Sequence, residues 1–210
     1  MPRLSTLAIL AVVLALLILS ASYLGCTPKV EPVPVEESLV PEGIKKHIQE
    51  ELERSFFWFK DLKWYVLEEC EGGVLAIAAF QGATRSRRIP EPGRSWYVWG
   101  YFQQVPEGSE TKWVRVTITS DPLAPEGRVF GGGWRSVGQN QYCAAGWVLD
   151  SRAARAVLAR TTPDGKTEEF PCTVKNGFWW TGPHAWGSYW PDRAIVYSDS
   201  GKILYDGKWE

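Results

Sequence analysis

The sequence contains very little histidine, with two residues in 210, and only four cysteines. Zinc sites and two-histidine relays need several of these residues at close spacing. His47 and His184 stand far apart in the chain, and no two cysteines form a Cys-x-x-Cys pair. We therefore expect no metal site and no cofactor.

An excess of charge of either sign is also missing, since 23 Lys and Arg oppose 24 Asp and Glu, for a formal net charge of −1. Nucleic acids and anionic bilayers attract proteins through a positive field, which this composition does not produce. The basic cluster at 84–88 (TRSRR) has no interleaved aromatic residues and is typical of a solvated loop. A nucleic-acid partner is not expected.

The sequence also contains no recognisable set of catalytic residues. Glu68 and Glu69 are neighbours on a predicted strand, as are Glu168 and Glu169, so each pair points to opposite faces and cannot flank one glycosidic bond. The glycine run at 131–134 (GGGW) lacks the Gly-Lys-Ser/Thr ending of a phosphate loop and is predicted to be a turn. These absences favour a protein that is not an enzyme.

The chain begins with an export segment. Residues 7–19 form an uninterrupted apolar run behind Arg3. A positive N-terminus followed by such a run is typical of a signal peptide. Residues 1–25 are therefore predicted to be a signal peptide, and the rest of the chain is expected outside the cytoplasm.

Cys26 follows this segment in the sequence Leu-Gly-Cys. The sequence resembles the lipobox of bacterial lipoproteins, in which a small residue, here Gly25, precedes a cysteine that receives a diacylglyceryl group. The resemblance implies lipid attachment at Cys26 and a location at the outer face of the cell membrane. Two alternatives stay open: cleavage after residue 22 with free secretion, and an uncleaved anchor, since about 25 uncharged residues are enough to span a bilayer.

Residues 26–42 contain four prolines and four glutamates, a composition that favours an extended, solvated tether. The remainder, 43–210, is predicted to be a single globular domain. Ile44, Ile48, Leu52 and Phe56 recur every four residues, which predicts one amphipathic helix over 44–59 that packs against the domain.

The rest of the chain has the pattern of β-strands. Two strands around the turn 71–73 predict a hairpin over 63–80, and further strands are expected at 95–105 and 111–119. Residues 120–141 have no clear periodicity and are predicted to be a long loop. Short strands joined by tight turns at 163–165 and 175–177, with no helix between them, indicate antiparallel pairing. The expected fold is mainly β, an antiparallel sandwich or small barrel of about nine strands.

The C-terminal third of the chain resembles a known group of small β-rich domains. The runs 146–170 (GWVLDSRAARAVLARTTPDGKTEEF), 176–180 (NGFWW) and 194–206 (AIVYSDSGKILYD) resemble the β-rich part of small secreted or lipoprotein domains of unknown function from Gram-positive bacteria. The resemblance implies that these hairpins build one edge of a sheet. It implies no enzymatic activity.

Three cysteines remain if Cys26 carries lipid, so at most one disulfide forms inside the domain. Cys143 and Cys172 lie in the same strand-rich section and are the favoured pair, which leaves Cys70 as a free thiol. The alternative is that all three are buried as small apolar residues.

Tryptophan is abundant, with twelve residues and a dense group at 178–190. Indole rings either stack on the C–H faces of sugars or fill a core. Trp180, Trp186 and Trp190 are therefore candidates for ligand stacking. The sequence predicts a membrane-tethered binding or structural domain of the bacterial cell envelope, with cell-wall glycan or another envelope protein as partner. The alternatives are a dedicated glycan-binding module and a cell-wall hydrolase whose carboxylates come together on folding.

Overall fold

The computed structural model describes residues 32–85, 94–123, 128–186 and 190–208. These residues belong to one compact unit that begins at Pro32. The predicted signal peptide and Cys26 lie outside the described residues. Within those ranges, no helix has the length and apolar character needed to cross a membrane.

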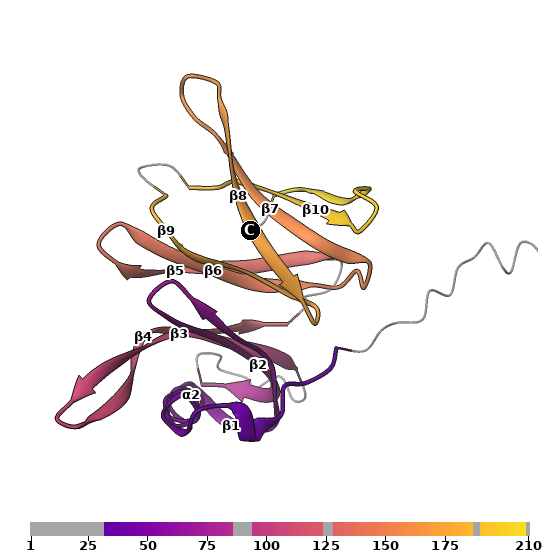
Figure 1. Ribbon diagram of the computed structural model, residues 1–210. Helices are drawn as coiled ribbons and strands as arrows, with labels where there is room; N and C mark the ends of the chain where they lie inside the picture. The colour runs from indigo at the N-terminus through magenta and orange to yellow at the C-terminus, as the bar shows by residue number, and fades with distance from the viewer. Residues whose placement is uncertain (1–31, 86–93, 124–127, 187–189, 209–210) are drawn as a thin grey trace, which may run out of the picture. The chain divides into compact units, whose positions relative to one another are not determined.

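In this part of the chain, a short 3-10 helix η1 (Glu37–Leu39) and the α-helix α2 (Glu42–Ser55) precede eleven strands (Figure 1). The strands are β1 (Phe56–Cys70), β2 (Gly73–Thr84), β3 (Ser95–Glu107), β4 (Glu110–Pro122), β5 (Phe130–Gly138), β6 (Gln141–Val148), β7 (Ala153–Thr161), β8 (Thr167–Lys175), β9 (Phe178–His184), β10 (Arg193–Ser198) and β11 (Ile203–Gly207).

The strands form two sheets in which every pairing is antiparallel. Sheet A has the order β1-β2-β3-β4, and sheet B has the order β11-β10-β7-β8-β9-β6-β5. Sheet B curls into a half-barrel, so that β7 and β10 lie across from β5 and β6 (Figure 1). The predicted mainly β, antiparallel fold with one helix is confirmed.

Helix α2 packs on the outer face of sheet A. Its buried side chains Ile44, Ile48 and Leu52 join the aromatic and apolar residues of that face. The predicted packing against the domain is therefore confirmed. The predicted end of the helix is wrong, because Phe56 already has extended backbone and pairs with Thr84 of β2. The run of bulky aromatic residues at 56–59 suits a strand better than a helix.

The two faces of sheet B are both buried. One face packs on sheet A and forms the inter-sheet core, to which Ile77 and Trp147 belong. The concave face forms the inner core of the half-barrel, to which Trp179 and Val196 belong. Because adjacent residues of a strand point to opposite faces, β6 is buried along a continuous run, 143–148.

The predicted loop 120–141 is wrong in its second half, because β5 lies there and pairs with β6. The glycines at 131–133 are part of this strand and do not form a turn. A Cβ atom at Gly132 would lie 2.5 Å from the ring of Trp179, so only glycine lets that indole pack against the backbone. Because three consecutive residues of β5 are glycines, the alternation of polar and apolar side chains that predicts a strand is not visible in its sequence.

Part of the segment predicted to be a tether packs on the domain. The backbone N–H of Val35 donates to the carbonyl of Trp64 at 2.7 Å, and Val40 is only 2 % exposed. Val35 and Val40 therefore pack in the core that lies between α2 and sheet A.

Candidate functional site

Aromatic side chains gather at the concave face of sheet B, brought together by β5, β6, β8 and the chain that follows β9. We call this group the aromatic cluster; its members are Trp134, Tyr142, Phe170, Trp186 and Trp190. The curl of sheet B places its separated strands around one space, and the alternation of each strand turns these residues inward.

The closest contact in the aromatic cluster is between Trp134 and Trp190, whose rings stack at 3.9 Å with an interplanar angle of 18°. Tyr142 meets the edge of Trp190 at 4.6 Å. Trp186 lies in edge contact with Trp190 at 5.5 Å. The rings therefore support one another in a fixed arrangement, as offset and edge-to-face pairs favour.

Burial is uneven across the aromatic cluster. Trp186 is fully buried, whereas Trp190 is 37 % exposed. Trp134, Tyr142 and Phe170 are half-buried. The cluster thus has a buried base and a rim that solvent reaches, and Trp190 is its most exposed member.

Polar groups lie beside these rings. The guanidinium of Arg160 sits 5.1 Å from the centre of the Phe170 ring. It donates to the carbonyl oxygen of Trp186 and, through Nε at 2.7 Å, to the carboxylate of Glu168. The imidazole of His184 lies 6.1 Å from Phe170. Apolar ring faces and hydrogen-bonding groups therefore occur together, as in sites for small polar ligands.

The structure brings together two of the three tryptophans predicted to stack on a ligand, Trp186 and Trp190. Trp180 is not with them: it is 4 % exposed and belongs to the inter-sheet core, on the other face of sheet B. The side chain of its neighbour Trp179 lies on the concave face of sheet B instead. Trp134 is not among the predicted stacking residues, because the sequence pattern predicts a loop over 120–141.

The predicted Cys143–Cys172 disulfide is absent from the structure, in which Cys70, Cys143 and Cys172 are free thiols. Cys143 lies in the inter-sheet core and Cys172 in the inner core, so a sheet separates the two sulfur atoms. Burial raises the pKa of each thiol to about 12. Both are protonated at neutral pH.

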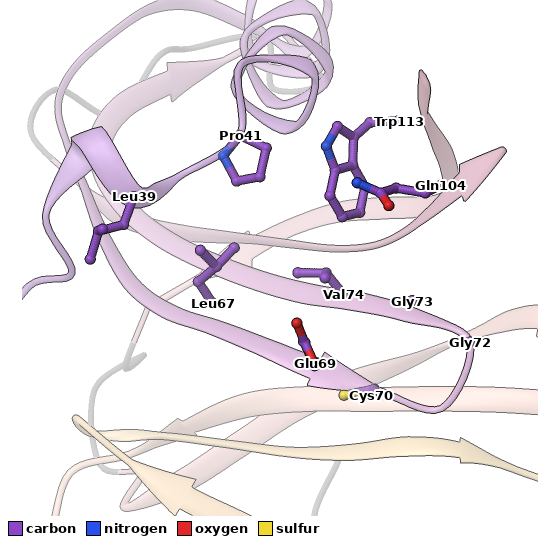
Figure 2. A pocket seen from close by; sticks show the side chains of 10 residues that line it. All are labelled: Leu39, Pro41, Leu67, Glu69, Cys70, Gly72, Gly73, Val74, Gln104 and Trp113. Carbon is purple, nitrogen blue, oxygen red and sulfur yellow. The ribbon is translucent and has the colours of Figure 1, made fainter. Parts of the chain in front are cut away.

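A separate pocket of about 580 Å³ opens on the helix side of sheet A, near the turn between β1 and β2 (Figure 2). Its wall combines apolar and polar groups, with Trp113 opposite Leu67 and with Cys70 at the end of β1 (Figure 2). The remaining lining residues are Leu39, Pro41, Glu69, Gly72, Gly73, Val74 and Gln104.

A buried polar group lies between the sheets. Tyr97 and Asp121 are paired residues of β3 and β4, and Arg135 of β5 reaches across to donate to Thr119 at 2.5 Å. Burial raises the pKa of Asp121, and Arg135 partly offsets this effect. In the described chain, neither the Tyr97 hydroxyl nor Oδ2 of Asp121 has a hydrogen-bond partner.

Among the described residues, no group of three or more His, Cys, Asp or Glu side chains has the arrangement of a metal site. Searches of protein-family models, of curated proteins and of solved structures found no match for this chain.

Proposed function

We propose that this protein is a binding domain of the bacterial cell envelope, held at the outer face of the membrane through Cys26, and that it binds cell-wall glycan at the aromatic cluster. The contact between Trp134 and Trp190 carries the proposal, because it presents a half-exposed indole that is held rigidly from behind. A rigid ring loses little conformational entropy when it stacks on a ligand.

Sugar rings have apolar C–H faces and hydroxyl edges. Indole faces suit the C–H faces, and the guanidinium of Arg160 with the carboxylate of Glu168 suits the hydroxyls beside them. The net charge of −1 gives no general attraction for polyanions, so a ligand that is largely neutral and polar fits the chain best.

The test is a fluorescence titration of the full-length chain, kept in mild detergent, with soluble peptidoglycan fragments. Trp190→Ala is the test variant. Trp58→Ala is its matched control, because Trp58 is 39 % exposed, close to the 37 % of Trp190, but lies on β1 of sheet A. We expect Trp190→Ala to weaken binding about 10-fold or more and the control to bind like the natural chain.

Equal affinity in the two variants would place the ligand elsewhere. A natural chain whose fluorescence and melting temperature do not change with peptidoglycan fragments or soluble glucans would remove glycan as the ligand class. Neither outcome bears on the membrane tether, which has its own test.

The tether is tested by mass spectrometry of the mature N-terminus. We expect a chain that starts at Cys26 and carries a diacylglyceryl group. A start at Tyr23 would mean ordinary secretion, and an intact Met1 would mean an uncleaved anchor; either result overturns the lipoprotein proposal.

A further inference from the structure

The pocket on the helix side of sheet A is built by the pairing of its strands. Leu67 and Glu69 lie on one face of β1, because side chains two residues apart on a strand point to the same side. Glu69 pairs with Val74 of β2, and Gln104 of β3 pairs with Trp113 of β4. Leu67, Val74 and Trp113 pack against the core between α2 and sheet A. The floor of the pocket is therefore the face of sheet A that carries the helix.

Helix α2 holds Trp113 in place. The ring nitrogen Nε2 of His47 donates a hydrogen bond to the carbonyl oxygen of Trp113 at 3.0 Å. A Cβ atom at Gly43 would lie 2.8 Å from Cβ of Trp113 and 3.1 Å from its ring, so the helix lies directly against this side chain. Leu39 and Pro41, which precede the helix, close the same side of the pocket (Figure 2). The indole is thus fixed before a ligand binds and loses little conformational entropy on binding.

Glu69 is the charged residue of the pocket. Of the described residues, those that line the pocket include no Lys, Arg or His. The neighbouring Glu68 points to the other face of β1 and forms an ion pair with Lys175 of β8. Within the described part of the chain, the side chain of Glu69 makes no ion pair or hydrogen bond. Its carboxylate rises from β1 beside Leu67 and Val74 (Figure 2), where a ligand can reach it.

The charged residue and the indole stand at opposite ends of the pocket. Glu69 lies on β1 and Trp113 on β4, the two edges of sheet A. At the usual spacing of strands, this separates their backbones by roughly 14 Å. Leu67 and Val74 provide apolar side chains to the same pocket. The pocket therefore offers a carboxylate at one end and a flat ring at the other, with apolar surface in the space between.

We infer that this pocket binds a small organic cation, in which an ammonium group is joined by a short chain to an aromatic or other apolar body. The Glu69 carboxylate pairs with the ammonium group, and the body packs on the Trp113 indole. A volume of about 580 Å³ lies within the range of about 300–1,000 Å³ that small-molecule sites have. An anionic ligand would be repelled by Glu69, and a neutral ligand would leave this carboxylate without a partner.

The test is isothermal titration calorimetry of the full-length chain in a non-ionic detergent at low ionic strength. The probe is 4-phenylbutylamine, and 4-phenylbutan-1-ol and 4-phenylbutyrate carry the same ring with a neutral and an anionic head group. Glu69→Gln is the test variant. Glu71→Gln is the matched control, because Glu71 is an exposed glutamate in the turn after β1 and does not line the pocket. One detergent concentration throughout keeps partition of each probe into micelles the same for every variant.

We expect the natural chain to bind the amine about 5-fold more tightly than the alcohol, and the carboxylate most weakly. Glu69→Gln should weaken binding of the amine about 3- to 5-fold and leave binding of the alcohol unchanged, because only the amine pairs with the lost charge. Glu71→Gln should bind all three probes like the natural chain. Circular dichroism verifies that the variants are folded.

The inference would be overturned by an amine that does not bind, that binds no more tightly than the alcohol, or that binds Glu69→Gln and the natural chain equally. Trp190→Ala separates this pocket from the aromatic cluster, which belongs to sheet B. Its affinity for the amine should equal that of the natural chain, and a loss there would place the amine at the aromatic cluster instead. Failure of glycan binding leaves these expectations unchanged, because the pocket shares no residue with the aromatic cluster.

Discussion

The indole N–H of Trp179 donates a hydrogen bond to the carbonyl oxygen of Gly131 at 3.0 Å, across the strand β6 that lies between their own strands. The bond passes over Gly146, where a Cβ atom would lie 2.0 Å from the Gly131 carbonyl oxygen and 2.7 Å from Nε1 of Trp179. The Phe130 ring stacks on Trp179 at 4.9 Å. The glycines of β5 and β6 therefore leave the space in which the Trp179 indole packs against the backbone.

Gly132→Ala should destabilise the fold by about 2–3 kcal/mol, because the added Cβ would lie 2.5 Å from the ring of Trp179 and 2.6 Å from the carbonyl oxygen of Ala145. Gly182→Ala, on β9, is the control: no atom lies within 4 Å of its added Cβ. We expect the control to change stability by less than about 1 kcal/mol. Urea unfolding measures both, and similar losses in the two variants would contradict this account.

Glu51→Gln should cost about 1–3 kcal/mol, because Glu51 is a buried carboxylate that accepts hydrogen bonds from Arg54 at 2.5 Å and from Ser55 at 2.8 Å. Arg115 of β4 also lies 3.7 Å from it. Glu53→Gln on the same helix is the control, since Glu53 is exposed and accepts a hydrogen bond from the exposed Gln49 side chain. Thermal unfolding measures both variants. An equal loss of unfolding free energy in the control would show that the loss comes from a general change in the helix and not from the contacts of Glu51.

Asp121→Asn should change how stability depends on pH. Burial raises the pKa of Asp121 above its ordinary value of 3.8, so the folded state holds this proton to a higher pH than the unfolded state does. The stabilising contribution of the carboxyl group is therefore complete below pH 3.8 and is lost as the pH rises through the folded-state pKa. Asparagine does not ionise.

The free energy of unfolding of Asp121→Asn, relative to the natural chain, should accordingly increase as the pH rises from below 3.8 to neutrality. Urea unfolding at a series of pH values gives this difference. A difference that stays constant with pH, or that falls, would show that Asp121 is not in a desolvated position.

Native thiols should react in a fixed order, with Cys70 first. Cys70 is half-buried, whereas Cys143 and Cys172 are buried and have pKa values of about 12, so their thiolates are scarce at neutral pH. We expect Cys70 to be labelled by an alkylating reagent about 10-fold faster or more. Peptide mass spectrometry over a time course measures the three rates, and the same labelling in urea should make them equal. A native rate for Cys172 equal to that of Cys70 would contradict the burial described here.

Much of the fold was predictable from local patterns. The spacing of Ile44, Ile48 and Leu52 predicted α2, because a helix brings every fourth residue to one side. The tight turns with glycine at 165 and 177 predicted antiparallel hairpins, and both glycines have a positive φ. The strand β5 was not predicted, because its three consecutive glycines show no alternation of polar and apolar side chains.

The candidate site was less predictable. Alternation along a strand says that Trp179 and Trp180 point to opposite faces, but it does not say which face lines the half-barrel. The same holds for Cys143 and Cys172, which share a sheet and face away from each other. The partner of Trp190, Trp134, comes from a strand that was not expected.

Periodicity and the turns between neighbouring segments are enough to predict the helix, most of the strands and their antiparallel pairing, because these features are local in the chain. Local patterns do not predict which tryptophans meet, which cysteines are separated by a sheet or where an indole remains exposed. Those outcomes depend on the curl of sheet B and on the packing of one sheet against the other, and neither leaves a local pattern in the sequence.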